Sequence, residues 1–327
     1  MTRVFLPLTL LVTVLFAASL LIGPAGLGLS ESLSALFTGQ GGPVVQVMQE
    51  IRLPRAILGL LTGAAFGLAG AAMQGYLRNP LAEPGLIGVS SSAALGAVLA
   101  LQTGLAATFA LALPLSALAG AAMSVLLILA LAGPRGGALA LILAGIAISA
   151  LAAALTSLVL NLSPNPFAAM EIVYWMMGSL ADRSMTHVWL AAPFILTGMA
   201  ALLTLGRGLD ALTLGEDAAQ SMGVNLSRLR WVLILGTAAA IGASVAVAGA
   251  VGFVGLVVPH LLRPLVVARP SRLLPAAALG GAAMLLAADI ATRLIAPDQD
   301  LKLGVLTAIV GAPFFLHLIW RMRRVEA

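Results

Sequence analysis

The chain has no cysteine, a single lysine and few charged side chains of either sign. Without cysteine there can be no disulfide and no thiolate chemistry, and three scattered histidines exclude most metal sites as well. Only 9% of the residues are charged, against roughly 25% in a soluble globular domain. Hydrophobic residues make up 61% of the chain, and the mean hydropathy is +1.09. This composition indicates a membrane protein.

Sequence signatures of enzymes are also missing. The chain has no G-x-x-x-x-G-K-[ST] phosphate-binding loop, and Lys302, the only lysine, cannot serve as one. The patterns H-E-x-x-H and G-x-S-x-G do not occur either. We therefore expect no catalytic residue, no metal site and no cofactor bound by this chain, and any ATP would be hydrolysed on another chain.

Hydropathy predicts an all-α polytopic membrane protein with about ten transmembrane helices in one transmembrane domain, 1–327. The first run follows Arg3 and is too long for the apolar part of a signal peptide, so it is interpreted as a retained span. The eighth span is too short to cross about 30 Å of hydrocarbon and should be buried among other helices. The predicted spans are 4–22, 56–77, 86–105, 112–132, 138–160, 188–206, 231–250, 252–264, 273–295 and 303–320.

The basic residues predict the orientation of the chain in its membrane. Most of them lie on the cytoplasmic side when the N- and C-termini are both cytoplasmic, as the positive-inside rule requires. In this orientation 207–230 is the longest cytoplasmic loop. The segment 161–187 is too polar to span, and its Trp and Tyr residues predict a periplasmic segment lying at the membrane interface.

The most informative stretch runs from Arg52 to Ser92. It begins RLPR, continues through an apolar helix with Gly59, Gly63 and Gly67 on one face, and ends RNPLAEPGLIGVSSS. Small residues four apart allow a neighbouring membrane helix to approach closely. A Pro-containing turn then separates this helix from the next apolar run.

RLPR and RNPLAEPGLIGVSSSAALGA resemble the membrane-spanning permeases of bacterial ABC importers for iron-siderophores, haem and cobalamin. The resemblance continues in GEDAAQSMGV, GAVGFVGLVVPHLLR, LLAADIATRL and LGVLTAIVGAPFFLHLI, so it covers nearly the whole chain in collinear order. It implies the type II ABC importer fold and a permease subunit that moves an iron-chelate (siderophore or haem) or cobalamin inwards. The partners it implies are a second copy of the permease, two ATP-binding subunits that carry ATP and Mg, and a periplasmic substrate-binding protein.

An ion-coupled secondary transporter is the alternative. That mechanism needs titratable or ion-coordinating groups near the middle of the membrane. Only Asp289 and His260 are candidates, and His260 is interpreted as structural because no carboxylate lies near it in sequence.

Three arginines form the predicted outer docking site. Arg52 and Arg55 lie three residues apart at the outer end of the second span, and Arg293 lies in the ninth. In the similar permeases, arginines here meet glutamates of the periplasmic binding protein. The alternative is that they anchor the helix at the membrane interface. Asp289, four residues before Arg293, is expected to pair with it and orient it.

The cytoplasmic loop contains a pattern similar to the acid-Ala-Ala-x3-Gly coupling loop of ABC importers. Its acids suit the first turn of a helix and its last glycine suits the end, although a capped, exposed helix could have no function. The predicted coupling residues are Gly215, Glu216, Asp217, Ala218, Ala219 and Gly223.

Two further sites are implied by the family. Asn79 and Leu81 match positions that narrow the cytoplasmic mouth of the pathway, although Asn-Pro is also a common turn pair. Ser149 and Thr156 lie on the fifth span, which lines the pathway in the family, although such residues often hydrogen-bond their own helix.

Two local features bear on the substrate and on the last span. Residues 174–178, YWMMG, resemble the cobalamin permease, whereas the other motifs fit siderophore and haem permeases equally well. Lys302 replaces a proline that relatives usually have before Gly304. The sequence therefore leaves the substrate, and the start of the last span, open.

Overall fold

The computed structural model describes residues 2–23, 26–39, 42–109, 111–133, 137–297 and 299–326, and in these residues it contains helices and no strands. The helices, in chain order, are α1 Thr2–Leu21, α2 Leu29–Thr38, α3 Pro43–Gln46, the π-helix η1 Val47–Arg52, α4 Leu53–Leu77, η2 Pro84–Ile87, α5 Val89–Gln102, η3 Leu105–Ala107, α6 Ala112–Ala132, α7 Ala138–Asn161, α8 Pro166–Met176, α9 Met185–Leu203, α10 Gly206–Leu212, α11 Glu216–Ser221, α12 Leu226–Ala248, α13 Val254–Leu262, η4 Arg263–Val266, α14 Pro270–Ile295 and α15 Leu303–Glu326.

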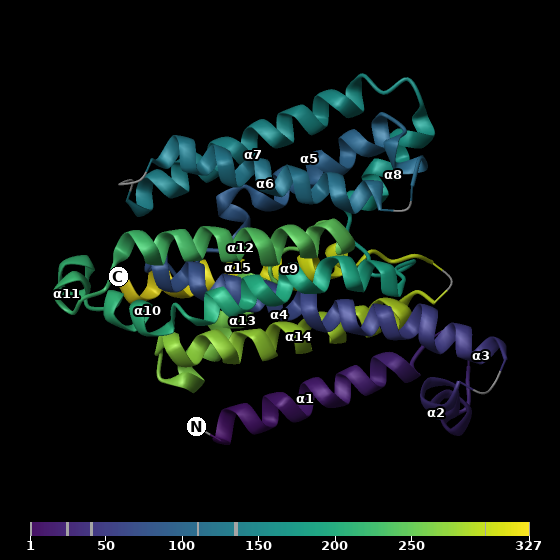
Figure 1. Cartoon of the computed structure of the whole chain (residues 1–327). Helices are drawn as coiled ribbons and strands as arrows, with labels where there is room; N and C mark the ends of the chain where they lie inside the picture. The colour runs from purple at the N-terminus through teal and green to yellow at the C-terminus, as the bar shows by residue number, and fades with distance from the viewer. Residues whose placement is uncertain are drawn as a thin grey trace.

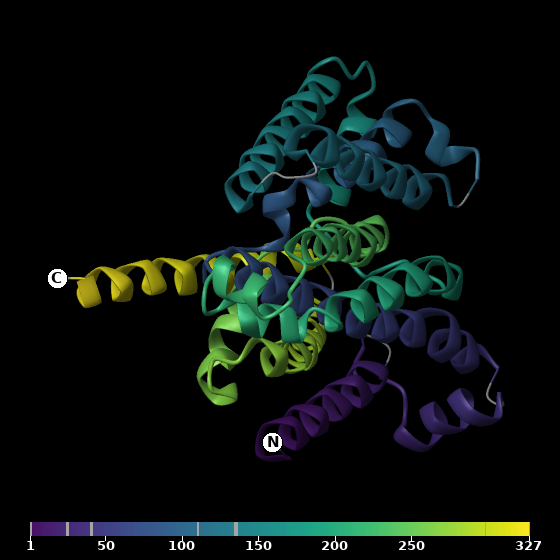
Figure 2. The same cartoon turned by 60° about the vertical axis from the view of Figure 1, so that its left-hand side comes forward.

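The long helices run roughly side by side, with α4 and α12 near the middle of the bundle (Figure 1). Helices α5, α6 and α7 form a layer on one side, and α14 and α1 lie on the other (Figure 1). Both chain ends lie towards the same end as α11, whereas α2 and α3 lie at the opposite end (Figure 1). Figure 2 shows α15 extending beyond the other helices at its C-terminal end.

Among the described residues, seven helices are long and apolar enough to cross a membrane: α1, the continuous helix from Pro43 to Leu77, α6, α7, α9, α12 and α14. Three shorter apolar helices, α5, α13 with η4, and the first part of α15, occupy the third, eighth and tenth predicted spans. Nearly all of α13 is buried, as its shortness predicts. Hydropathy therefore locates each of these apolar helices, and the structure gives the bounds of each helix.

Several predicted bounds are wrong where polar residues extend or interrupt a helix. The second span begins at Pro43 rather than 56, because Pro43 starts a helix that continues through the polar turn η1 into α4. Gln49 in this extension donates to the carbonyl oxygens of Ala35 and Leu36 and so holds α2, which hydropathy does not predict. The seventh span begins at Leu226 rather than 231, because Asn225 caps α12 by accepting from the Arg228 amide at 2.9 Å.

The predicted interfacial segment 161–187 also differs in detail. Only α8 within it is a complete helix, and Asn165 caps it by accepting from the Phe167 amide. The last residues of the segment belong to the first turn of α9. The helix α8 exposes most of its apolar side chains and buries Ile172, which suits an amphipathic element on the surface of the bundle.

The predicted glycine face brings α4 and α14 into backbone contact. A Cβ on Gly63 would collide with the carbonyl of Gly281, and a Cβ on Gly67 would collide with that of Ala277. Close approach of this kind is what small residues allow in membrane helices. Gly59 faces the side chains of Leu286 and Leu180 instead. The α4–α14 pair is therefore held by direct van der Waals contact between the two backbones.

The start of α15 is fixed by loops far away in sequence. The amides of Leu303 and Gly304 donate to the carbonyl oxygens of Gly178 and Met177 at 2.9 and 3.0 Å. Lys302 pairs with Asp300 and places its ammonium 5.3 Å from the centre of the Tyr174 ring. With Lys302 at the position where relatives usually have proline, α15 begins at Leu303, and these backbone hydrogen bonds hold its first residues.

We expect Gly67→Leu to separate α4 from α14 and lower the thermal unfolding midpoint in detergent, because overpacking costs about 1–3 kcal/mol or more where backbone blocks relaxation. Gly59→Ala is the matched control, since its Cβ would meet a movable leucine side chain at 3.2 Å. Equal midpoints for the two variants would show that the glycine contact does not stabilise the pair.

Candidate functional site

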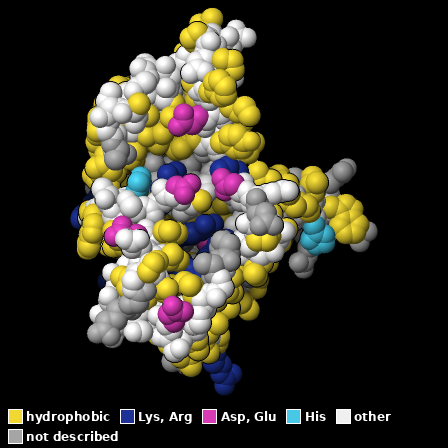
Figure 3. Space-filling model, turned by 90° about the vertical axis from the view of Figure 1, so that its right-hand side faces the viewer, with side chains coloured by type: hydrophobic (Ala, Val, Ile, Leu, Met, Phe, Trp, Pro, Cys, Tyr) yellow, Lys and Arg dark blue, Asp and Glu magenta, His cyan; other side chains and the backbone are white. Residues whose placement is uncertain are grey.

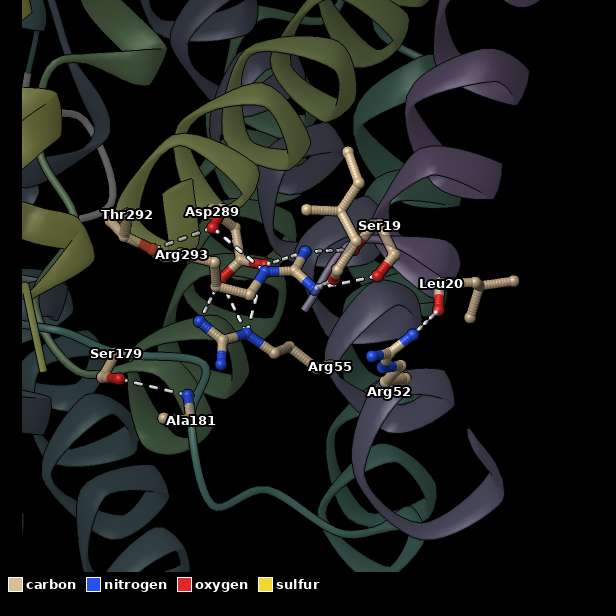
Figure 4. Close-up of polar contacts among 10 residues, drawn as sticks. Ser19, Leu20, Arg52, Arg55, Ser179, Ala181, Asp289, Thr292 and Arg293 are labelled. Carbon is tan, nitrogen blue, oxygen red and sulfur yellow. Dashed lines mark hydrogen bonds and ion pairs between the residues drawn. The ribbon is translucent and has the colours of Figure 1, made fainter. Parts of the chain in front are cut away.

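Asp289 is the centre of a charged cluster near the C-terminal end of α14. Arg55 of α4 places Nε 2.9 and 3.1 Å from its two carboxylate oxygens and Nη2 2.9 Å from Oδ1. Arg293, one turn along α14, donates from Nη2 to Oδ2 at 2.9 Å (Figure 4). The Asp289 side chain is only 2% exposed. The predicted pairing of Asp289 with Arg293 is confirmed. The ion pair with Arg55 was not predicted, because Arg55 and Asp289 lie far apart in the sequence.

Arg293 and a third arginine, Arg52, hold the C-terminal end of α1. Arg293 Nη1 donates to the carbonyl oxygens of Ser19 and Ile22 at 2.9 and 2.6 Å. Arg52 Nη1 donates to those of Leu20 and Leu21 at 3.1 and 2.8 Å (Figure 4). The last carbonyls of a helix have no intrahelical partner and carry a partial negative charge, so a guanidinium stabilises them. The cluster therefore binds α1 to α4 and α14.

The three predicted docking residues differ in their exposure and in their partners. Arg52 is 4% exposed, and its Nη1 atom is bound to α1. The Arg55 side chain is 18% exposed and lines a hollow of about 220 Å³ together with Arg293 and Asp300. The end-on view shows charged side chains of both signs in the middle of this face with hydrophobic ones around them (Figure 3). Docking through Arg55 and Arg293 stays a prediction, and Arg52 is placed where it supports α1.

At the opposite end of the molecule the predicted coupling residues form a short exposed helix, α11. Gly215 is its N-cap, and Glu216 and Asp217 are exposed in its first turn. Gly223 has φ +84, and its amide and that of Val224 donate to the carbonyls of Gln220 and Ala219. These two bonds are the Schellman arrangement that ends a helix at a glycine. Ala219 is buried beneath the helix, whereas Ala218 is half-buried.

Two large apolar side chains flank α11 and are open to solvent. Leu214 precedes its N-cap, and Met222, which is 64% exposed, follows its last turn. Exposed apolar side chains around a rigid polar helix are typical of a protein–protein contact. The end of the bundle near α11 thus has the character of a docking surface.

A partly buried carboxylate, that of Asp210, connects this end of the chain to α14. Asp210 of α10 accepts from the Ser271 amide at 2.8 Å, from the Ser271 hydroxyl at 2.6 Å and from Arg269 Nε at 2.9 Å. Burial acts to raise the pKa of the Asp210 carboxyl, but these hydrogen bonds outweigh it and the pKa lies below its usual value. Asp210 therefore caps the N-terminus of α14 from another helix. Sequence spacing gave no signal for this contact, because the partners are about sixty residues apart.

The predicted gate residues lie in a structured turn. Asn79 Oδ1 accepts from the Leu81 amide at 2.9 Å, and its carbonyl accepts from the Ala82 amide at 3.2 Å. Arg78, just before it, ends α4 with φ +48. The alternative given by the sequence, turn chemistry at Asn-Pro, is therefore present in the structure, and a gating role stays a prediction.

The two predicted pathway residues face different surroundings. Ser149 lines a cavity of about 590 Å³ between α7, the start of α5 and the loop before α13. Thr156 is 5% exposed and lies on the buried stripe of α7 with Ile148 and Ala152. Of the two, only Ser149 borders open space. Glu83, which was not among the predicted site residues, lines the same cavity.

Apolar helices of this length, with α4, α12 and α14 enclosed by the others, define a multi-pass membrane protein of the permease class. The chain belongs to the FecCD transport family, whose profile matches residues 10–321. It is 38% identical to the hemin transport system permease protein HmuU of Yersinia pestis, over 98% of this chain and 96% of that protein.

Two further likenesses agree with this assignment. The vitamin B12 import system permease protein BtuC of Klebsiella pneumoniae is 38% identical over 97% of this chain and 93% of its own length. A solved structure of an inward-facing conformation of a metal-chelate type ABC transporter superposes with a TM-score of 0.87 at 34% identity, covering 98% of this chain and all of the other. The resemblance read from the motifs is confirmed, and the ABC importer family is favoured over an ion-coupled secondary transporter.

We expect Arg52→Gln to lower the thermal unfolding midpoint and to expose α1 to limited proteolysis. The variant leaves buried carbonyls of α1 without a guanidinium partner, at a cost of about 1–3 kcal/mol. Arg207→Gln is the control, since Arg207 is exposed in α10. If Arg52→Gln instead left stability unchanged and only weakened docking of a binding protein, the assignment of Arg52 to helix capping would be wrong.

Proposed function

We propose that the chain is the permease subunit of a binding-protein-dependent ABC importer that moves an iron-chelate, haem or cobalamin across the bacterial inner membrane. Family membership supports the importer class, and the names of the relatives support this group of substrates. The observation that carries the proposal is that the two ends of the bundle differ: the exposed helix α11 lies at one end, and the arginine cluster around Asp289 lies at the other. Each end suits a different soluble partner.

The proposed assembly contains two copies of the permease, which enclose the pathway between them as one domain each. The three shorter apolar helices would complete ten membrane passages, because α5, α13 and the first part of α15 are too short to cross alone but lie among longer ones. Both termini and α11 lie at the same end of the bundle, so a cytoplasmic α11 places both termini in the cytoplasm.

ATP and Mg would be bound by two ATPase subunits that contact α11. The C-terminal end of the helix is fixed by the two hydrogen bonds around Gly223, and Leu214 and Met222 offer apolar contact area. A displacement of α11 would reach α14 through α10, because Asp210 binds Ser271 and Arg269 at the start of α14. Asn79 and Leu81 would narrow the cytoplasmic mouth, and Ser149 and Thr156 would line the pathway.

At the outer end, Arg55 and Arg293 would attract acidic side chains of the binding protein. Two guanidinium groups share one carboxylate at this point, so the pair carries a net positive charge with Arg55 partly exposed. Attraction of this kind mainly raises the association rate.

Two variants distinguish contact with the ATPase from transmission of the α11 displacement to α14. Met222→Glu places a charge in the proposed contact and should abolish both co-purification of the ATPase and ATP-dependent uptake into proteoliposomes. Asp210→Asn should keep the ATPase bound but lower the amount of substrate moved per ATP by about tenfold, because the charge-assisted bonds to α14 are weakened.

Phe37→Glu is the matched control for Met222→Glu, since Phe37 is 79% exposed on α2 at the opposite end of the molecule. Normal uptake by Met222→Glu would remove α11 from the mechanism. Complete loss of ATPase binding in Asp210→Asn would assign Asp210 to the contact itself.

Arg55→Gln should slow association with the binding protein by a few-fold at low salt. The difference should shrink as salt rises, because the Debye length falls to about 8 Å near physiological ionic strength. Asp289 keeps its ion pair with Arg293 in this variant, and the thermal unfolding midpoint is measured as well, so that a loss of stability is distinguished from a loss of docking. Arg228→Gln, exposed near the α11 end, is the control, and an unchanged rate and salt dependence for Arg55→Gln would exclude Arg55 from docking.

A further inference from the structure

The cavity beside α7 contains an unusual carboxyl group. Its volume is about 590 Å³, within the range of small-molecule sites. Three hydroxyls line it, from Ser90, Ser91 and Ser149, together with apolar side chains such as Phe66. Among the described residues that line it, Glu83 is the only charged one.

The fold holds the Glu83 side chain in place without neutralising it. Glu83 is extended, with φ −133 and ψ 160, immediately before the short helix η2. Its carboxylate folds back over Gly85, where a Cβ would lie 3.2 Å from Oε1. In the described part of the chain no side-chain hydrogen bond or ion pair reaches this carboxylate.

Burial raises the pKa of the Glu83 carboxyl, and no neighbouring charge opposes the effect. The groups that face the cavity from α4, α5, α7 and the loop before α13 are hydroxyl, apolar or backbone groups. A half-buried carboxyl with no partner is costly, so a ligand that hydrogen-bonds with it would be stabilised there.

We propose that this cavity is a contact site for the transported chelate, where Glu83 and the three hydroxyls bind neutral amide or hydroxyl groups and disfavour polyanionic cargo. The proposal rests on the proposed transport function and narrows its substrate class. An amide can both donate to a carboxylate and accept from a protonated carboxyl or a hydroxyl. An ionised carboxylate on the cargo would meet a like group and no cation, which is unfavourable in a low-dielectric site.

The first test uses dicyclohexylcarbodiimide, an apolar reagent that modifies protonated carboxyl groups. In the purified permease–ATPase complex, peptide mass spectrometry should find Glu83 modified, and more so at about pH 6 than at about pH 8, because a raised pKa keeps more of the group protonated. Glu216, exposed on α11, is the internal control and should react less.

The second test adds candidate cargo before the reagent. Cobalamin, which carries neutral amides, and a neutral ferric hydroxamate are the probes expected to protect Glu83, whereas ferric citrate should not. In uptake assays Glu83→Gln should stay within about twofold of the native protein, since an amide replaces the carboxyl, and Glu83→Leu should lose about tenfold.

Protection by ferric citrate, or equal uptake in Glu83→Gln and Glu83→Leu, would overturn the inference. So would absence of Glu83 modification at both pH values in a complex that transports normally, and in each case the transport function would stand. Protection by cobalamin or the hydroxamate without ATP-dependent uptake of any chelate would instead support the site and contradict the proposed function.

Discussion

The backbone contact between α4 and α14 is the constraint on which the rest of the structure depends. Gly63 and Gly67 on α4 and Gly281 on α14 carry no side chain, so the backbones of the two helices touch at these positions. In a lipid environment, close packing of this kind replaces the hydrophobic driving force that water supplies to soluble proteins. Because the two backbones interlock, α4 and α14 are expected to move as one body.

This body reaches both ends of the molecule. At one end of α14, Ser271 is bound by Asp210 of α10, next to the exposed helix α11. At the other end, Asp289 binds Arg55 of α4, and Arg293 binds the last carbonyls of α1. Hydrogen bonds and backbone contacts therefore form a continuous path from α10, next to α11, to the Asp289 cluster at the C-terminal end of α14.

The two charged clusters differ in what they stabilise. Asp210 makes short bonds to a helix N-terminus and is not deeply enclosed, so it can respond to a partner at the same end. Asp289 is almost completely buried and shared by two guanidinium groups, and breaking such a pair by removing one partner is typically costly. The Asp289 cluster is thus expected to stay rigid, and the Asp210 contact is the better candidate for a place where two helices move relative to each other.

The sequence by itself determined the class of protein, the order and position of the apolar helices, and the short exposed helix α11 that ends at Gly223, because hydropathy, helix-end signals and motif spacing act over a few residues. Gly59, Gly63 and Gly67 predicted a close helix contact, and Asp289 predicted its pairing with Arg293 one turn away.

Only the tertiary structure decided which helix meets that glycine face, that Arg52 caps α1, that Arg55 shares Asp289 and that Asp210 caps α14. It also decided that Glu83 faces a cavity without a partner. The physical reason is distance along the chain. Each of these contacts joins residues tens to hundreds of positions apart, and local periodicity carries no information about which buried polar groups will meet when the helices pack.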